Sequence, residues 1–161
     1  MNIKEAQIFG RTKVVKGTGL IVGILLIIFL IMSTISDFGN GILFFFEAIL
    51  NIHFLAIMAI LFGLTLLFGS SAGKEIILEK KNYILTSVKY VILIILAIII
   101  YAGVVGVVKD KTNTPDNFER LITTYFLTPL VKTGSITIIP MLGVWLWATN
   151  QMQSKVAEEK Q

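Results

Sequence analysis

The strongest constraint on the fold is the uncharged run of residues 90–108, YVILIILAIIIYAGVVGVV. A helix needs about 20 apolar residues to cross about 30 Å of hydrocarbon, and it pairs its own backbone polar groups there. Only 15% of the 161 residues are charged, whereas soluble domains have about 25%. The run therefore predicts a transmembrane helix in an all-α integral membrane protein.

Three more apolar stretches predict a protein of four transmembrane helices. We expect these spans at about residues 18–36, 42–68, 90–108 and 131–149, within one membrane domain of residues 18–149. The SDFGNG segment, with its glycines, Asp and Asn, predicts a tight turn between the first two spans. No small-residue cleavage site follows the first stretch, so we expect a retained span and not a signal peptide.

Residues 115–128 predict a short amphipathic helix between spans three and four. Thr114 is suited to cap it and Pro115 to occupy its first position. Apolar side chains recur at helical spacing and would form one stripe, which suits a helix in the outer interface. These side chains are Phe118, Leu121, Ile122, Tyr125 and Phe126. Pro129 is expected to end the helix.

The distribution of basic residues predicts the orientation. With both termini on one side, ten of the 14 Lys and Arg residues share that side, and the positive-inside rule makes it cytoplasmic. Residues 1–17 would form a cytoplasmic arm and residues 150–161 a cytoplasmic tail, in the inner (plasma) membrane. Trp145 and Trp147 are expected in the cytoplasmic aromatic belt.

Four polar side chains are candidates for an intramembrane polar site: Glu47, Asn51, His53 and Lys132. If span two begins near Asn51, Glu47 lies in the outer headgroup region and His53 just inside it. If the span begins at Ile42, it must tilt, and His53 lies near the midplane. Lys132 lies at the outer end of span four, where a long side chain reaches the interface. Both an interfacial role and a proton, ion or quinone site therefore follow from the sequence.

Two pairs of glycines are candidates for helix packing. Gly19 and Gly23 form a G-x-x-x-G pair in span one, and Gly103 and Gly106 thin one side of span three. Small residues allow helices to approach closely in membranes. The partner of each pair lies either within the chain or in another subunit.

The residue types exclude several classes of function. The chain has no cysteine and one histidine, so disulfides, thiolate metal sites and bis-histidine haem ligation are excluded. We expect no cofactor and no metal. The basic residues form no dense cluster, which argues against nucleic-acid binding. With no P-loop, G-x-S-x-G or H-E-x-x-H motif, we expect that the chain is not an enzyme.

Two functions remain. In the first, the chain is a small non-catalytic subunit that stabilises a larger respiratory, transport or secretion complex, with lipid and other membrane subunits as partners. In the second, it is a small transporter or channel that works as a homo-oligomer and uses the polar residues of span two. Four spans enclose little space alone, so the second function requires the oligomer.

Overall fold

The computed structural model describes residues 1–36, 40–109 and 118–158, and these residues form helices and short connections without strands. The elements are α1 (Ile3–Ser36), α2 (Gly41–Leu50), α3 (Ile52–Gly73), η1 (Lys74–Leu78), α4 (Tyr83–Lys109), α5 (Phe118–Ile122), η3 (Thr123–Leu127) and α6 (Thr128–Glu158). Both η segments are π-helical turns that continue a neighbouring α-helix. The all-α prediction is confirmed for the described part of the chain.

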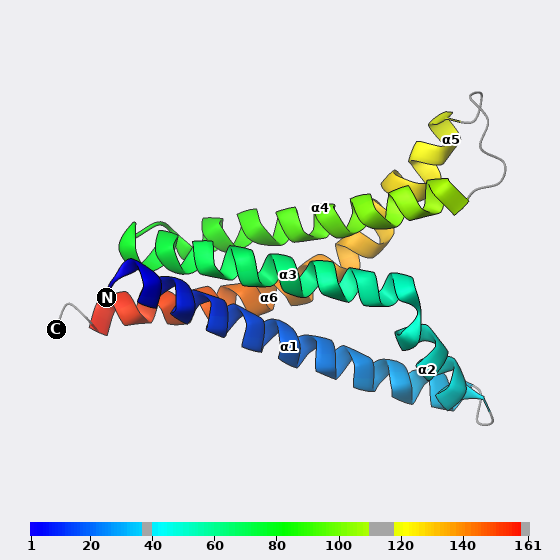
Figure 1. The fold of residues 1–161 in the computed structure, drawn as a ribbon, viewed down its shortest axis with the longest axis horizontal. Helices are drawn as coiled ribbons and strands as arrows, with labels where there is room; N and C mark the ends of the chain where they lie inside the picture. Colours follow the sequence, from blue (N-terminus) through cyan, green and yellow to red (C-terminus); the bar gives the residue numbers. More distant parts are fainter. Residues whose placement is uncertain (37–39, 110–117, 159–161) are drawn as a thin grey trace.

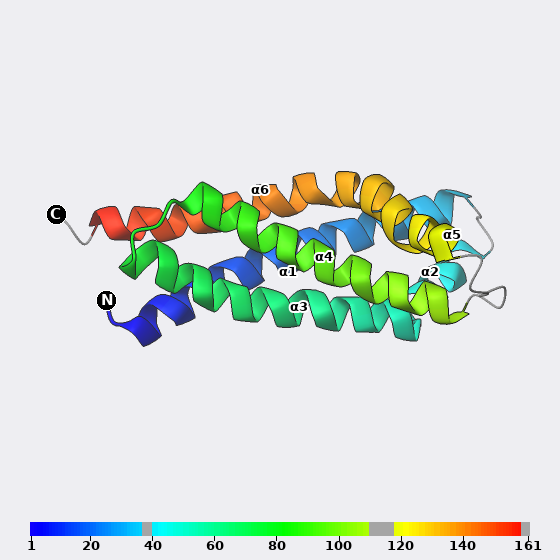
Figure 2. The same ribbon diagram turned by 90° about the horizontal axis from the view of Figure 1, so that it is seen from above.

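Three described helices are long and apolar enough to cross a membrane: Ile3–Ser36, Ile52–Leu78 and Tyr83–Lys109. The 31-residue α6 lies beside them, and the four long helices form an elongated bundle with both termini at one end (Figures 1 and 2). Helix α1 begins at Ile3, so the predicted N-terminal arm is the first part of the same helix as span one.

The second predicted span is wrong as one helix, because the chain breaks at Asn51. This residue has an extended backbone (φ −62°, ψ 131°), and its side-chain oxygen accepts a hydrogen bond from the His53 backbone N–H at 2.9 Å. An N-cap of this kind starts a new helix by satisfying one of its free N–H groups. The ten residues of α2 therefore form a separate helix between the end of α1 and the start of α3 (Figure 1). Its Phe44 and Phe45 rings pack against Phe29 of α1.

The segment after residue 117 also differs from the prediction. Residues 115–117 lie outside the described residues, and Pro129 does not end a helix there but lies in the first turn of α6. The π-helical turn η3 precedes it, with the Thr128 N–H bonded to the Thr123 carbonyl. Proline is tolerated inside a membrane helix where a local π-helical adjustment satisfies the backbone groups that it frees. Helical structure therefore runs from Phe118 to Glu158 without a gap.

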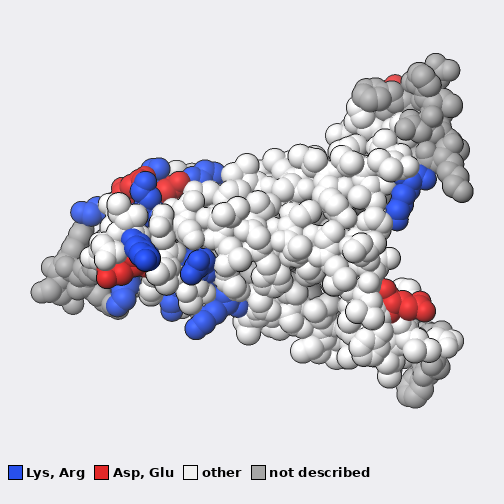
Figure 3. Space-filling model, in the orientation of Figure 1, with Lys and Arg blue, Asp and Glu red and all other residues white. Residues whose placement is uncertain are grey.

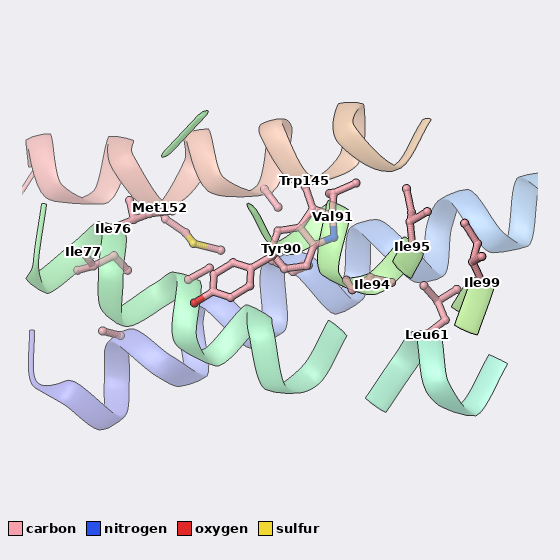
Figure 4. Close-up of a cluster of buried hydrophobic side chains, with 14 residues drawn as sticks. Leu61, Ile76, Ile77, Tyr90, Val91, Ile94, Ile95, Ile99, Trp145 and Met152 are labelled. Atoms are coloured by element: carbon pink, nitrogen blue, oxygen red, sulfur yellow. The ribbon is translucent and has the colours of Figure 1, made fainter. Parts of the chain in front are cut away.

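The main core lies between the long helices (Figure 4). It contains buried side chains from α1, α3, η1, α4 and α6: Ala6, Val14, Leu61, Ala72, Ile76, Ile77, Tyr90, Val91, Ile94, Ile95, Ile99, Trp145, Ala148 and Met152. Trp145 is fully buried among them, whereas Trp147 is 51% exposed. The prediction that both tryptophans face the membrane interface is therefore wrong for Trp145. The opposite end diverges, with α2 and α5 extending in different directions (Figure 1).

Candidate functional site

The predicted polar residues of the second apolar stretch do not meet in one site. Glu47 is exposed on α2 and borders an open recess of about 630 Å³ with Ser33 and Asn40. Asn51 caps α3, and the His53 ring nitrogen Nδ1 lies 3.2 Å from the Tyr101 hydroxyl of α4. Within the described part of the chain, no hydrogen bond or ion pair joins Glu47 to Asn51 or His53. Asn51 and His53 are thus neighbours at the start of α3, and Glu47 lies apart from both.

His53 and Asn51 have clear structural contacts. The His53–Tyr101 hydrogen bond joins the start of α3 to α4 and is partly buried. This bond and the Asn51 cap both lie at the end of the bundle away from the termini (Figure 1). The side chain of Lys132, the fourth predicted residue, lies outside the described residues.

The glycines of the two predicted packing pairs differ in their surroundings. In α4, a Cβ atom added at Gly103 would overlap the Phe126 ring, and one added at Gly106 would overlap the Tyr125 ring. Two aromatic side chains of η3 therefore pack directly against these glycines. In α1, a Cβ atom added at Gly19 or Gly23 would meet nothing within 4 Å.

A close approach of two long helices lies elsewhere, between α1 and α3. Ala6 and Gly10 on α1 face Gly69 and Gly73 on α3, so each helix supplies a small-x-x-x-small pair. A Cβ atom at Gly73 would overlap the Ala6 carbonyl oxygen and lie 3.0 Å from the Gly10 Cα. We call these four residues the α1–α3 seam. Sequence inspection missed it, although the spacing of four in each helix was the available signal.

A group of ion pairs connects η1 to the start of α4. The Glu75 carboxylate accepts hydrogen bonds from Lys89 Nζ at 2.7 and 2.8 Å and from the Tyr90 hydroxyl at 2.8 Å. The Glu75 side chain is only 16% exposed. Hydrogen bonds to a charged group are roughly twice as strong as neutral ones. The Tyr90 ring also stacks on Phe68, with centroids 4.9 Å apart. Glu75 therefore links two helices and fixes the position of Tyr90.

A second group of charges lies just beyond η1. Glu79 pairs with Lys81 at 2.9 Å and with Lys74 at 3.3 Å. The pKa of the Glu79 carboxyl is lowered from its ordinary value, first by the hydrogen bond from Lys81 and then by that from Lys74. The pKa of Lys81 is raised, chiefly by the same bond to Glu79. These side chains are between 37% and 52% exposed, so their pairing contributes little to stability.

The bundle also contains an apolar cavity of about 440 Å³ between α1, α3, α4 and α6. Each helix contributes to its wall, for example Val22, Leu61, Ile95 and Pro140. Trp145 also lines it, and its indole N–H has no hydrogen-bond partner among the described residues. The cavity wall is therefore apolar, and the Trp145 N–H is enclosed by the protein.

The part of the chain that the structure describes has no cluster of metal-binding groups. In residues 1–36, 40–109 and 118–158, no three His, Asp or Glu side chains come together as a possible metal site. Comparisons with known protein families, with curated proteins and with solved structures found no match to this chain.

Proposed function

We propose that this chain is a small non-catalytic subunit that packs within the membrane against other subunits of a larger complex. The observation that carries the proposal is the open face of α1 around Gly19 and Gly23. Small residues in membrane helices allow close helix contact. The chain uses Gly10 and Gly17 of the same helix for internal contacts, but a Cβ atom at Gly19 or Gly23 would meet nothing within 4 Å.

The exposed face continues along α1 with apolar side chains. Leu20 is 69% exposed and Ile27 is 59% exposed, and Gly19, Gly23 and Ile27 recur every four residues on one side of the helix. A second transmembrane helix that packed there would approach the α1 backbone closely. Lipid chains would not pack as closely against these glycines as a second helix would.

The proposal includes four spans, with α6 as the fourth, and both termini in the cytoplasm of an inner (plasma) membrane. Charged side chains gather at the end of the bundle that holds the termini and η1, and the middle is bare of them on the face in Figure 3. The predominance of Lys and Arg at that end supports a cytoplasmic position under the positive-inside rule.

The test is purification of the tagged chain from its native membrane in a mild detergent. We expect other membrane subunits to co-purify at a fixed ratio. Gly23→Leu should reduce their recovery by about tenfold, since a bulky side chain blocks close approach. Gly63→Leu is the matched control, because Gly63 of α3 also has nothing within 4 Å of an added Cβ atom. An unchanged recovery for Gly23→Leu, or an equal loss for both variants, would contradict the proposal.

The same experiment addresses the homo-oligomeric transporter or channel. A ring made only of this chain would favour that function over the subunit. In that case, Glu47→Gln or His53→Phe should lower transport about tenfold or more and alter its pH dependence, with assembly intact. For a packing subunit we expect both variants to have small effects on the activity of the complex.

A further inference from the structure

Four side chains of α1 form a stripe on its surface, just before the uncharged part of the helix. Phe9, Thr12, Lys13 and Lys16 recur at i, i+3, i+4 and i+7, the spacing at which side chains share one face of a helix. Thr12 and Lys16 are exposed, and Phe9 and Lys13 are half-buried. We call these four residues the basic stripe. The α1–α3 seam uses another face of the same helix, so packing against α3 does not cover the stripe.

The basic stripe lies at the edge of the part of α1 that can cross hydrocarbon. Residues 17–36 have no charged side chain, and at 1.5 Å per residue they cover about 30 Å, the thickness of the hydrocarbon layer. Lys16 immediately precedes this segment. Tryptophan is enriched at the membrane interface, and Trp147 packs beside Gly17, where an added Cβ atom would lie 3.5 Å from the indole ring. Lys13 and Lys16 therefore lie at the depth of the lipid phosphates.

The two lysines of the basic stripe have no acidic partner among the described residues, and neither forms an ion pair or hydrogen bond there. The acidic side chains described at this end of the bundle are already engaged. Glu5 accepts a hydrogen bond from the Asn2 backbone N–H at 3.0 Å. Glu75 and Glu79 pair with lysines outside the stripe. Two positive charges are thus left for an anion from outside the described chain.

The geometry of the helix directs the two ammonium groups out of the apolar layer. Helical side chains lean toward the N-terminus of their helix, and in α1 this direction leads away from the uncharged segment. Lys13 Nζ lies over the Phe9 ring, 5.3 Å from its centroid, a contact that attracts a cation. Thr12 places a hydroxyl group one turn before Lys16, and a hydroxyl can donate a hydrogen bond to the same anion.

We propose that the basic stripe binds the phosphate of an anionic phospholipid, with Lys13 and Lys16 as its positive partners and the Thr12 hydroxyl as a further donor. Attraction to an anionic membrane surface strengthens binding about fivefold per lysine. A zwitterionic lipid carries its own ammonium group beside the phosphate, so it gains little. The proposal is independent of the contact at Gly19 and Gly23, and it requires no particular orientation of the chain across the membrane.

The test measures lipid binding to the purified chain in detergent micelles by native mass spectrometry. The probes are phosphatidylglycerol and phosphatidylcholine with the same acyl chains, added at equal concentrations. We expect the wild-type chain to retain phosphatidylglycerol in preference to phosphatidylcholine by about tenfold or more. Equal retention of the two lipids would contradict the proposal. Displacement of phosphatidylglycerol by inorganic phosphate at the same concentration would assign the stripe to a free anion and overturn the assignment to lipid.

Two double variants separate the basic stripe from the general positive charge of this end. Lys13→Gln with Lys16→Gln removes two charges from the stripe and should lower phosphatidylglycerol retention about tenfold or more. Lys4→Gln with Arg11→Gln removes two charges from the same helix outside the stripe and should leave retention nearly unchanged. None of the four side chains is fully buried or forms an ion pair with a described residue, so both variants should unfold at the wild-type SDS fraction. Equal losses of lipid for the two variants would contradict a site at the stripe.

Recovery of other subunits distinguishes a lipid from an acidic protein partner. The double variant of Lys13 and Lys16 should leave the co-purification of membrane subunits unchanged, because their proposed contact lies at Gly19 and Gly23. If the variant lowers subunit recovery but still retains phosphatidylglycerol, an acidic segment of a partner occupies the stripe and the lipid proposal is wrong.

Discussion

Replacing Gly73 by alanine tests whether the α1–α3 seam holds the bundle together. The new Cβ atom would overlap the Ala6 carbonyl oxygen and lie 3.0 Å from the Gly10 Cα. All these neighbours are backbone atoms, so no rotamer change relieves the contact and the helices must separate. Overpacking of this kind costs about 1–3 kcal/mol. We expect the upper part of that range, about 2–3 kcal/mol, because backbone meets backbone.

The matched control is Gly63→Ala in the same helix. An alanine at Gly63 meets nothing within 4 Å, so only the helix propensity changes, with a gain of about 0.5–1 kcal/mol. Gly73→Ala receives the same gain, and the difference between the two variants therefore isolates the seam. Gly10→Ala should resemble Gly73→Ala, since its Cβ atom would lie 2.7 Å from the Gly73 nitrogen.

The assay is unfolding in mixed micelles of dodecyl maltoside and increasing SDS, followed by far-UV circular dichroism. We expect Gly73→Ala to unfold at a clearly lower SDS fraction than Gly63→Ala. Because Gly10 and Gly73 share one contact, the double variant should be less destabilised than the sum of the single variants. Equal midpoints for the Gly73 and Gly63 variants would refute the close contact between α1 and α3.

Three further predictions concern orientation and individual side chains. A cysteine at position 40 (Asn40→Cys) should react with an impermeant reagent from outside intact cells, whereas Ser71→Cys should not. Labelling of Ser71→Cys alone would mean that the chain has the opposite orientation in the membrane. Tyr90→Phe keeps the ring but removes the hydroxyl that donates to Glu75, so the free energy of unfolding, measured by thermal unfolding in detergent, should fall by about 1–2 kcal/mol. An unchanged free energy of unfolding would contradict a stabilising Tyr90–Glu75 hydrogen bond. His53→Phe loses one hydrogen bond to an α4 tyrosine and should cost about 0.5–1.5 kcal/mol in the same assay; a loss of several kcal/mol would mean that the imidazole does more than join two helices.

The apolar runs predicted the helices well because length and lack of charge are local properties. The expected span 90–108 lies inside α4, which extends it at its N-terminal end to Tyr83. The break at Asn51 was harder to foresee, since apolar residues continue on both sides of it. The available signal was an asparagine two residues before His53, a spacing suited to an N-cap.

Features that depend on which helices are neighbours were not accessible from the sequence. The Gly19–Gly23 pattern matches that of Gly69–Gly73, yet only the latter lies against another helix. Trp145 was expected at the membrane interface, a common place for tryptophan. It is buried because Tyr90 of α4 packs against it. Glu75, which joins η1 to α4, lies between the second and third expected spans, where no pattern in the sequence identifies its partners.

The α1–α3 seam has a consequence for the order in which the protein is made. All four of its residues lie within the first 73 positions, and no part of α4 or α6 takes part in the contact. The ribosome adds about 5–20 residues per second, so the first and third helices emerge several seconds before the last one. These two helices can pair in the bilayer during that interval, and α4 and α6 then insert beside an α1–α3 pair that has already formed.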